Sequence, residues 1–181
     1  TYPDALYLTC LAVEDDVAAR GMRASNYWQM DSYDAEELYA ANRRGQEPKA
    51  AGCYITSATL KDPETPHHAP AGTHTVEVMS IVSGDPADWG VSEDELAAGT
   101  YGRNAEYRRR KQAVEDDMLR RFNRLFPGVG QHVVFQESAT PLSHQRYTQA
   151  SGGTGYGIAA TPAQYGGGRP GTRTALPGLY V

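Results

Sequence analysis

The chain has 181 residues, which is the size of a single domain. Hydrophobic residues make up 40% and charged residues 22%, so the chain can bury a core and is not disordered as a whole. The net charge of −5 argues against nucleic acid as a partner, and no apolar run approaches the ~20 residues of a membrane-spanning helix.

The first predicted element is a strand over residues 5–13. This run is almost continuously apolar and lies between a Pro-Asp pair and an acidic triplet, which is typical of an internal strand. Residues 34–45 predict a short helix, with acidic side chains in its first turn, Arg43 and Arg44 in its last turn and Gly45 at its end. A second strand, rich in β-branched residues, is predicted over 53–60.

A proline-rich loop over 61–72 and a third strand over 73–82 follow, and then a further loop over 83–99. The clearest element is a helix over 103–125, because apolar residues recur there every three or four positions. Its predicted buried stripe consists of Tyr107, Lys111, Val114, Met118, Phe122 and Leu125. Pro127 and Gly128 end this helix, and a fourth short strand is predicted over 132–136.

Glycine becomes dense and apolar residues become sparse from Thr140 onward. Such a stretch builds no core of its own, so we expect an extended segment that lies close against other surfaces. The predicted fold class is α+β, with a mostly antiparallel sheet of four to five strands covered by one long helix and one or more short helices.

Several groups of side chains are candidates for chemical sites. His67, His68 and His74 match no zinc-binding spacing, so we expect a solvated loop and no metal. Cys10 and Cys53 each lie in an apolar run and are predicted to be buried thiols. No nucleophile elbow occurs, so hydrolase chemistry is not expected.

The glycines between Gly152 and Gly157 do not fit a dinucleotide-binding loop. Such a loop follows a strand and opens a helix, whereas this one follows polar residues and meets Pro162. The region from 103 to 124 carries eight basic and four acidic side chains. These basic residues are expected to contact phosphate, the acidic body of the same chain, or a neighbouring domain.

A resemblance to a known family rests on short phrases in a fixed order. They are Gly52-Cys-Tyr-Ile-Thr-Ser-Ala-Thr-Leu-Lys-Asp-Pro63, Asp88-Trp89, Tyr107-Arg-Arg-Arg-Lys111, Leu125-Phe-Pro-Gly128, Glu137-Ser-Ala-Thr-Pro141, Tyr147-Thr148, Gly155-Tyr-Gly157, Arg169-Pro170 and Pro177-Gly-Leu-Tyr180. In this order the chain resembles the C-terminal half of phytoene-desaturase and carotenoid-isomerase-like flavoproteins. Those proteins belong to the wider amine-oxidase-like group of FAD-dependent oxidoreductases.

The resemblance implies a substrate-binding domain that forms one wall of a cavity over FAD. Residues 1–139 correspond to its core, and residues 140–181 to a glycine-rich segment that returns toward an FAD-binding domain. The implied reaction is hydride removal from, or flavin-assisted isomerisation of, an apolar or amine-like small molecule. The main flavin-binding motifs of the family are absent from this chain, so FAD is expected in a longer parent protein and not on this chain alone.

The candidates for contact with substrate or flavin are carried over from the family segment that returns toward the flavin. They are Thr140, Pro141, Tyr147, Tyr156, Gly157 and Arg169. Arg169 is expected to meet an anionic group or to fix a loop. No residue is assigned a catalytic role, because the cofactor supplies the hydride chemistry.

The abrupt first and last residues lead us to expect a fragment that is inactive alone. Its bared apolar surface would promote self-association. The sequence shows no signal peptide or disulfide pattern, which favours the cytoplasm. The alternative function is a non-catalytic binding or interaction module that retains the fold, and it rests on the acidic body, the basic helix and the lack of a catalytic constellation.

Overall fold

The computed structural model describes residues 5–40, 45–159, 161–169 and 171–180. Its centre is a five-stranded sheet in the order β2-β3-β4-β1-β5, and every neighbouring pair of strands is antiparallel. The strands are β1 (Ala5–Val13), β2 (Tyr27–Met30), β3 (Gly52–Thr56), β4 (His74–Val82) and β5 (Val133–Ala139). The predicted α+β class is therefore confirmed.

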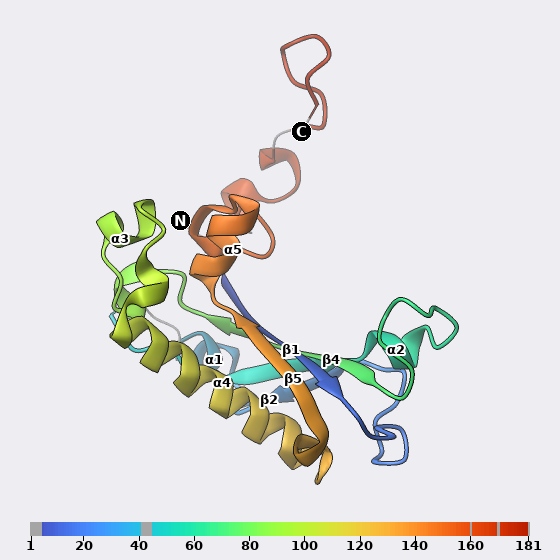
Figure 1. Cartoon of the computed structure of the whole chain (residues 1–181). Helices are drawn as coiled ribbons and strands as arrows, with labels where there is room; N and C mark the ends of the chain where they lie inside the picture. The colour runs from blue at the N-terminus through green and yellow to red at the C-terminus, as the bar shows by residue number, and fades with distance from the viewer. Residues whose placement is uncertain (1–4, 41–44, 160, 170, 181) are drawn as a thin grey trace.

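One long helix, α4, lies along one face of this sheet, and the shorter helices lie around its margins (Figure 1). The helices are α1 (Ala35–Ala40), α2 (Ala58–Lys61), α3 (Glu93–Ala97), α4 (Ala105–Leu125) and α5 (Pro141–Thr148). None of the helices in the described part of the chain is both long and apolar enough to cross a membrane.

The core lies between α4 and the sheet. Every second residue of β1 from Ala5 to Val13 is buried, and the residues between them are half-buried. Tyr7 packs parallel to Trp89 with ring centroids 6.0 Å apart, and its hydroxyl donates to the Lys111 carbonyl of α4 at 2.9 Å. Val114, Met118 and Phe122 of α4 complete this layer. Because α4 covers only one side of the sheet, the other side depends on something else for cover.

The predicted stripe of α4 is confirmed over most of its length. Tyr107, Val114, Met118 and Phe122 are buried, as expected from their spacing. Leu125 is instead 39% exposed, because it lies at the last turn where the helix passes the end of the sheet. Arg121 is buried in addition, which a hydrophobic periodicity does not predict.

Several predicted boundaries were wrong, and local capping explains them. The strand predicted over 53–60 ends at Thr56, because the Ser57 hydroxyl accepts from the Leu60 amide and starts the helical turn α2. The loop predicted over 83–99 contains a 3-10 turn and α3, which begins at a capping box formed by Ser92 and Glu95.

Two further elements differ from the sequence predictions. β2 was not predicted, since four residues are too few for a clear periodicity. The helix predicted over 34–45 is present as α1, while Arg43 and Arg44 lie outside the described residues.

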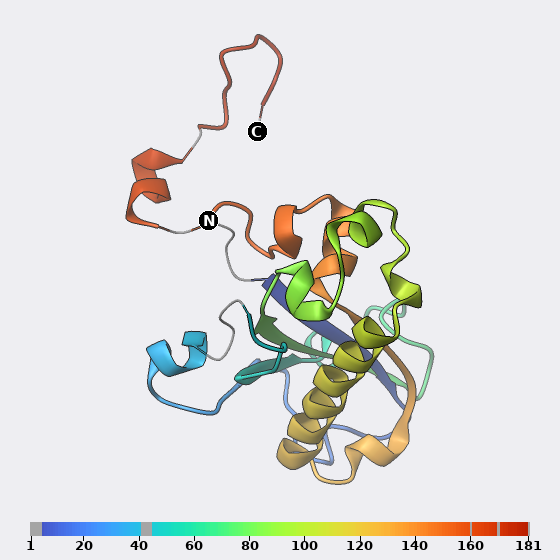
Figure 2. The same cartoon turned by 90° about the vertical axis from the view of Figure 1, so that its left-hand side faces the viewer.

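The chain after β5 was predicted as an extended segment, but it first forms α5. Thr140 caps this helix and Pro141 is its first residue, a position where proline loses no hydrogen bond. Beyond residue 159 the chain leaves the body of the molecule (Figure 2). Tyr165, Leu176 and Tyr180 of this tail are all exposed.

Candidate functional site

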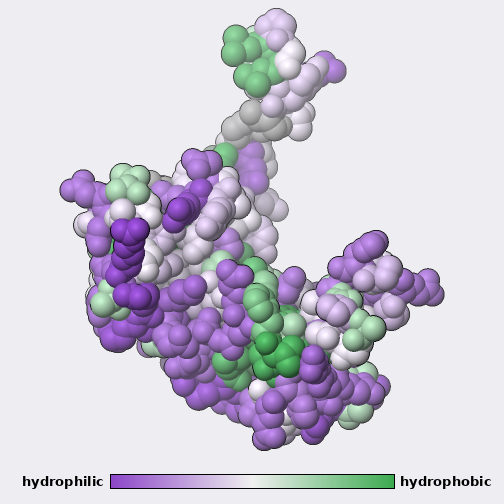
Figure 3. Space-filling model, in the orientation of Figure 1, coloured by the Kyte–Doolittle hydropathy of each residue, from purple (hydrophilic) through white to green (hydrophobic). Residues whose placement is uncertain are grey.

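The side of the sheet opposite α4 carries a continuous apolar row. The strand register pairs Trp28 with Tyr54, Tyr54 with Met79, Met79 with Leu8, and Leu8 with Ala139. Cross-strand partners lie on the same face of a sheet, so these five side chains form one row across all five strands. We call this side of the sheet the open face. Its hydrophobic surface over β1 and β5 lies in a hollow between α5 and the part of the chain formed by α2 and the loop after it (Figure 3).

A second apolar row runs beside the first. It contains Met30, Gly52, Ile81 and Leu6. A Cβ atom on Gly52 would lie 2.6 Å from the Gln29 carbonyl oxygen and 2.9 Å from the Met30 sulfur, so this position admits only glycine. Trp28 and Met30 remain 66% and 49% exposed, because β2 is an edge strand and no helix crosses above it. The open face is thus apolar over two adjacent rows.

The open face becomes polar one row further along the strands. Cys10 pairs with Glu77 on one side and with Glu137 on the other, so the thiol lies between two carboxyl groups. Partial burial raises the pKa of the Cys10 thiol, and the two nearby carboxylates raise it further. Neither glutamate has an ion-pair partner within the described residues.

The cysteine prediction was half right. Cys53 faces α4 and is buried, and burial raises the pKa of its thiol to about 11. Cys10 is only half-buried, because the open face has no covering layer at its position. Both thiols are free, and no three His, Cys, Asp or Glu side chains in the described ranges group as metal ligands.

Two of the candidate residues carried over from the family have structural roles. Thr140 is fully buried, and its hydroxyl lies 2.9 Å from the Tyr107 hydroxyl while accepting from the Ser143 amide at 3.3 Å. Pro141 is buried at the start of α5, against Gly153. Both side chains are packed inside the protein.

The other candidates lie on the surface. Tyr147 and Tyr156 are each 79% exposed. Gly157 has a φ of +76°, with open space where a side chain would stand. Arg169 donates to the Ile158 carbonyl at 2.9 Å, so it fixes a loop of the C-terminal segment. The six candidates thus divide into two buried residues at the start of α5 and four exposed positions, and their contact with substrate or flavin stays a prediction.

The C-terminal segment nevertheless reaches one end of the open face. Thr154 forms an isolated bridge with Ala5 at the start of β1. A Cβ atom on Gly155 would lie 2.4 Å from Leu6 Cδ1, so the segment passes directly over the end of the second apolar row. Tyr156 and Gly157 follow immediately, which places them at this border of the open face.

The glycines of this segment do not fit a phosphate-binding loop for FAD. Gly153 has a φ of +64°, and a Cβ atom there would lie 2.1 Å from the Pro141 carbonyl oxygen. At Gly155 the space for a side chain is likewise occupied by Leu6. Both glycines therefore make room for other parts of this chain and not for a ligand. The segment 154–159 forms no helix to supply the amide groups that bind phosphate. These residues do not form an FAD site by themselves.

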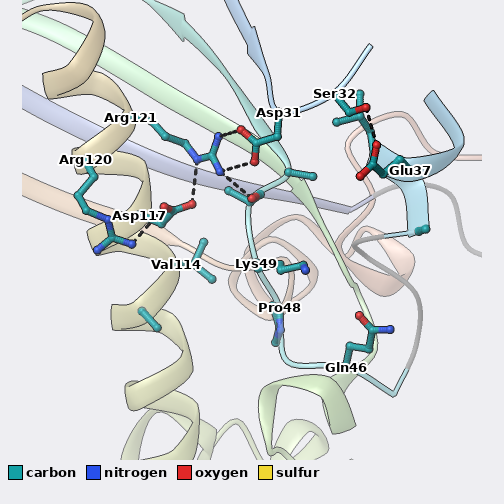
Figure 4. A pocket seen from close by; sticks show the side chains of 15 residues that line it. Asp31, Ser32, Glu37, Gln46, Pro48, Lys49, Val114, Asp117, Arg120 and Arg121 are labelled. Carbon is teal, nitrogen blue, oxygen red and sulfur yellow. Dashed lines mark hydrogen bonds and ion pairs between the residues drawn. The ribbon is translucent and has the colours of Figure 1, made fainter. Parts of the chain in front are cut away.

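A cavity of about 720 Å³ lies on the other side of the molecule, between α1, residues 46–51 and α4 (Figure 4). Four of its charged side chains form ion pairs with one another: Asp31, Asp117, Arg120 and Arg121. The Arg121 guanidinium donates to both carboxylate oxygens of Asp31 at 2.6 and 2.7 Å, to Asp117 at 2.8 Å and to the Ala50 carbonyl at 3.0 Å. Arg120 pairs with Asp117 at 3.1 Å. We therefore assign this group the role of a clamp that joins three segments, and not of a reactive site.

Four of the basic residues of α4 form ion pairs within the chain, namely Arg109, Arg110, Arg120 and Arg121. Arg109 donates to Glu47 at 2.5 Å and to Glu106 at 2.8 Å. Arg110 donates to Glu106 at 2.8 Å, and the hydrogen bonds from Arg109 and Arg110 hold the pKa of the Glu106 carboxyl at about 2. Their partners are Glu106 and Asp117 of α4 itself, and Glu47 and Asp31 from other parts of the chain.

The open face was missed by sequence analysis, although one signal for it was present. A strand with one solvated face alternates between apolar and polar residues, whereas residues 5–13 are apolar at nearly every position. Leu6 and Leu8 are the surplus apolar residues, and they point away from α4. The sequence therefore indicated that both faces of this strand are covered, but not which residues of the neighbouring strands lie beside Leu6 and Leu8.

Comparison with known proteins confirms the predicted resemblance at the level of sequence similarity. Prolycopene isomerase, chloroplastic, from Daucus carota is 32% identical over 115 residues, which cover 62% of this chain and 16% of that protein. Prolycopene isomerase 2, chloroplastic, from an Oncidium hybrid cultivar is 31% identical over 70% of this chain and 19% of that protein. All-trans-retinol 13,14-reductase from Danio rerio is 23% identical over 76% of this chain and 22% of that protein.

The chain therefore spans less than a quarter of the length of these curated relatives. No protein-family model matches it. Among solved structures, an oxidoreductase from Methanosarcina mazei aligns over 99% of this chain and 28% of that chain, with a TM-score of 0.39 and 17% identity.

Proposed function

We propose that this chain is the substrate-binding part of an FAD-dependent oxidoreductase and that the open face is a wall of its substrate site. The observation that carries the proposal is the apolar row from Trp28 to Ala139. Five strands spaced about 4.8 Å apart make this row about 19 Å long, which suits an elongated apolar molecule. Burial of such a molecule on the row is favourable in proportion to the apolar area removed from water.

The relatives support an elongated apolar substrate. The plant relatives are named for prolycopene, and the fish relative for all-trans-retinol. Both of those molecules are conjugated polyenes, and their shape suits a flat apolar surface. The aromatic rings of Trp28 and Tyr54 pack edge-to-face with centroids 4.9 Å apart. This contact fixes the orientation of both rings before a ligand binds.

The role proposed for this chain is binding, orientation and exclusion of water. Its two apolar rows contain no acid or base, so they hold a substrate without reacting with it. The redox chemistry belongs to FAD in a parent protein, bound mainly by parts that this chain does not contain. The reaction in that parent (desaturation, isomerisation or amine oxidation) is open, and the chain alone is expected to be inactive.

Two experiments test this function. A titration of the chain with the neutral dye Nile red, followed by fluorescence, measures binding to apolar surface. We expect Met79→Lys to abolish most of the signal, because it places a charge in the middle of the row, while Tyr33→Lys leaves it unchanged. Equal binding by both variants contradicts the assignment of the open face.

The second experiment concerns the cofactor. The native gene product is purified from its source, and its visible absorption spectrum is recorded with its intact mass. A larger protein with oxidised-flavin absorbance supports the proposal, whereas a colourless protein of the length of this chain refutes its FAD part and favours the interaction module.

The cytoplasmic location and self-association of the isolated chain also stay predictions; light scattering at increasing concentration tests the latter.

A further inference from the structure

We propose that the open face binds a single-chain amphiphile with a positively charged head, held between Glu77 and Glu137 with its apolar chain over Leu8 and Leu6. This inference rests on the proposed function and names the ligand chemistry of the same surface. It makes the two glutamates specificity-determining residues.

The geometry follows from the strand register. β1 lies between β4 and β5, so Glu77 and Glu137 stand on either side of Cys10 and on the same face as Leu8. Two strand spacings place their backbones about 10 Å apart. Cys10, whose side chain is small, stands between the two glutamates on this row. An ammonium group above Cys10 therefore has a carboxylate on each side.

Charge complementarity identifies the head. Glu77 is half-buried and Glu137 exposed, and neither has a cationic partner within the described part of the chain. Two like charges that share a site repel each other, and a bound cation relieves this repulsion. An ammonium group also brings three hydrogen-bond donors to carboxylates that accept no side-chain hydrogen bond from the residues that the structure describes. A carboxylate head would instead meet two like charges.

A second observation points to the same end of the open face. Thr75 pairs with Ala12, one row beyond Cys10, and follows the same alternation along β4 as Glu77. Its hydroxyl oxygen is fully buried and has no hydrogen-bond partner within the described residues. Thr75 shares its row with the apolar Ala12 and Phe135, so its hydroxyl is the polar group that lies next to the glutamate row on this face.

The direction of the apolar chain follows from the order of residues in β1. Leu8 and Leu6 lie about 7 and 14 Å from Cys10, because a strand advances about 3.4 Å per residue. A chain anchored at Cys10 runs over both leucines and ends under Gly155, where the C-terminal segment crosses Leu6. The charged head therefore lies at the end remote from that segment, and the apolar end lies beside it.

The test compares three ligands of equal chain length: decylammonium, decanol and decanoate, each below its micellar concentration. Binding is followed by isothermal titration calorimetry, because Trp28 on β2 lies three strands away from β1 and would not report contact there. We expect decylammonium to bind tightest and decanoate weakest. Each carboxylate should contribute about fivefold to the preference for decylammonium over decanol, the usual upper range for an exposed ion pair. This preference should shrink at high salt.

Variants locate the effect. Glu137→Gln and the double variant Glu77→Gln/Glu137→Gln should lower decylammonium affinity about fivefold and more than tenfold, respectively, and leave decanol affinity within about twofold. Glu93→Gln in α3 is the matched control and should change neither. Circular dichroism checks that each variant is folded; the single variant on the exposed edge strand keeps the test valid if the double variant unfolds.

The outcomes separate this inference from the proposed function. If decanol and decylammonium bind equally and the Gln variants change nothing, the anchoring role of the glutamates is overturned while the apolar wall stands. If none of the three ligands binds, the wall itself is refuted, and the inference falls with it. Decanoate binding as tightly as decylammonium also overturns the inference.

Discussion

Replacing Arg121 with methionine removes the one side chain that joins α4, the end of β2 and the segment before β3. Arg121 is 8% exposed, and its guanidinium donates to Asp31, Asp117 and the Ala50 carbonyl. Breaking a buried ion pair costs about 3–5 kcal/mol. Asp31 keeps 44% of its side chain exposed and can be rehydrated, so we expect the lower figure of about 2–3 kcal/mol.

Urea unfolding followed by circular dichroism measures this loss of stability. For a chain of this length, 2–3 kcal/mol corresponds to a fall in Tm of roughly 4–12 °C. Arg120→Met is the matched control, because its side chain is 69% exposed and makes one contact at 3.1 Å with Asp117. It should lose less than about 0.5 kcal/mol. Equal losses for the two variants would refute the reasoning that Arg121 clamps the three segments.

The same clamp makes a prediction about pH. Arg121 holds the pKa of the Asp31 carboxyl below its ordinary value of 3.8. A lowered folded-state pKa stabilises the fold above the unfolded-state pKa, and this stabilisation is lost as the pH falls through the folded-state value. The wild-type chain should therefore lose more stability than Arg121→Met between about pH 5 and pH 2. Parallel stability curves for the two proteins over this range would contradict the assignment.

Three further predictions concern packing and thiol chemistry. Gly153→Ala should destabilise the chain by about 2 kcal/mol or more, because the new methyl meets the Pro141 carbonyl at a positive φ; thermal unfolding measures this. Cys10 should react with a maleimide faster than Cys53, and a ligand on the open face should slow only Cys10; mass spectrometry of the labelled peptides checks both. Thr140→Val should cost about 1–2 kcal/mol by urea unfolding through loss of the helix cap, while Thr140→Ser should retain most of the stability.

Much of the fold was predictable because long elements carry strong periodic signals. The helix at 105–125 and the strands at 5–13 and 74–82 were predicted within two residues of their observed ends. Short elements were not, since four or five residues show too little periodicity. α3 is an instructive miss, because its capping box at Ser92 and Glu95 was visible in the sequence.

The open face could not be predicted residue by residue. Trp28, Tyr54, Met79 and Leu8 lie far apart in the chain and meet only through the register of four strands. A shift of one residue in any strand would move its side chain to the other face, and single-sequence patterns do not fix register that tightly. The buried polar role of Arg121 was hidden for a similar reason, since its partner Asp31 lies on another element.

The position of β1 inside the sheet has a consequence for how the protein folds during synthesis. β1 is made before both of its neighbours, and the first of them, β4, begins only at His74. At a translation rate of about 5–20 residues per second, this apolar strand waits roughly 3–12 seconds for that partner. Pairing across so large a sequence separation is also slow in itself. The nascent chain is therefore most open to aggregation in this interval, and a chaperone that shields residues 5–13 would raise the yield of folded protein.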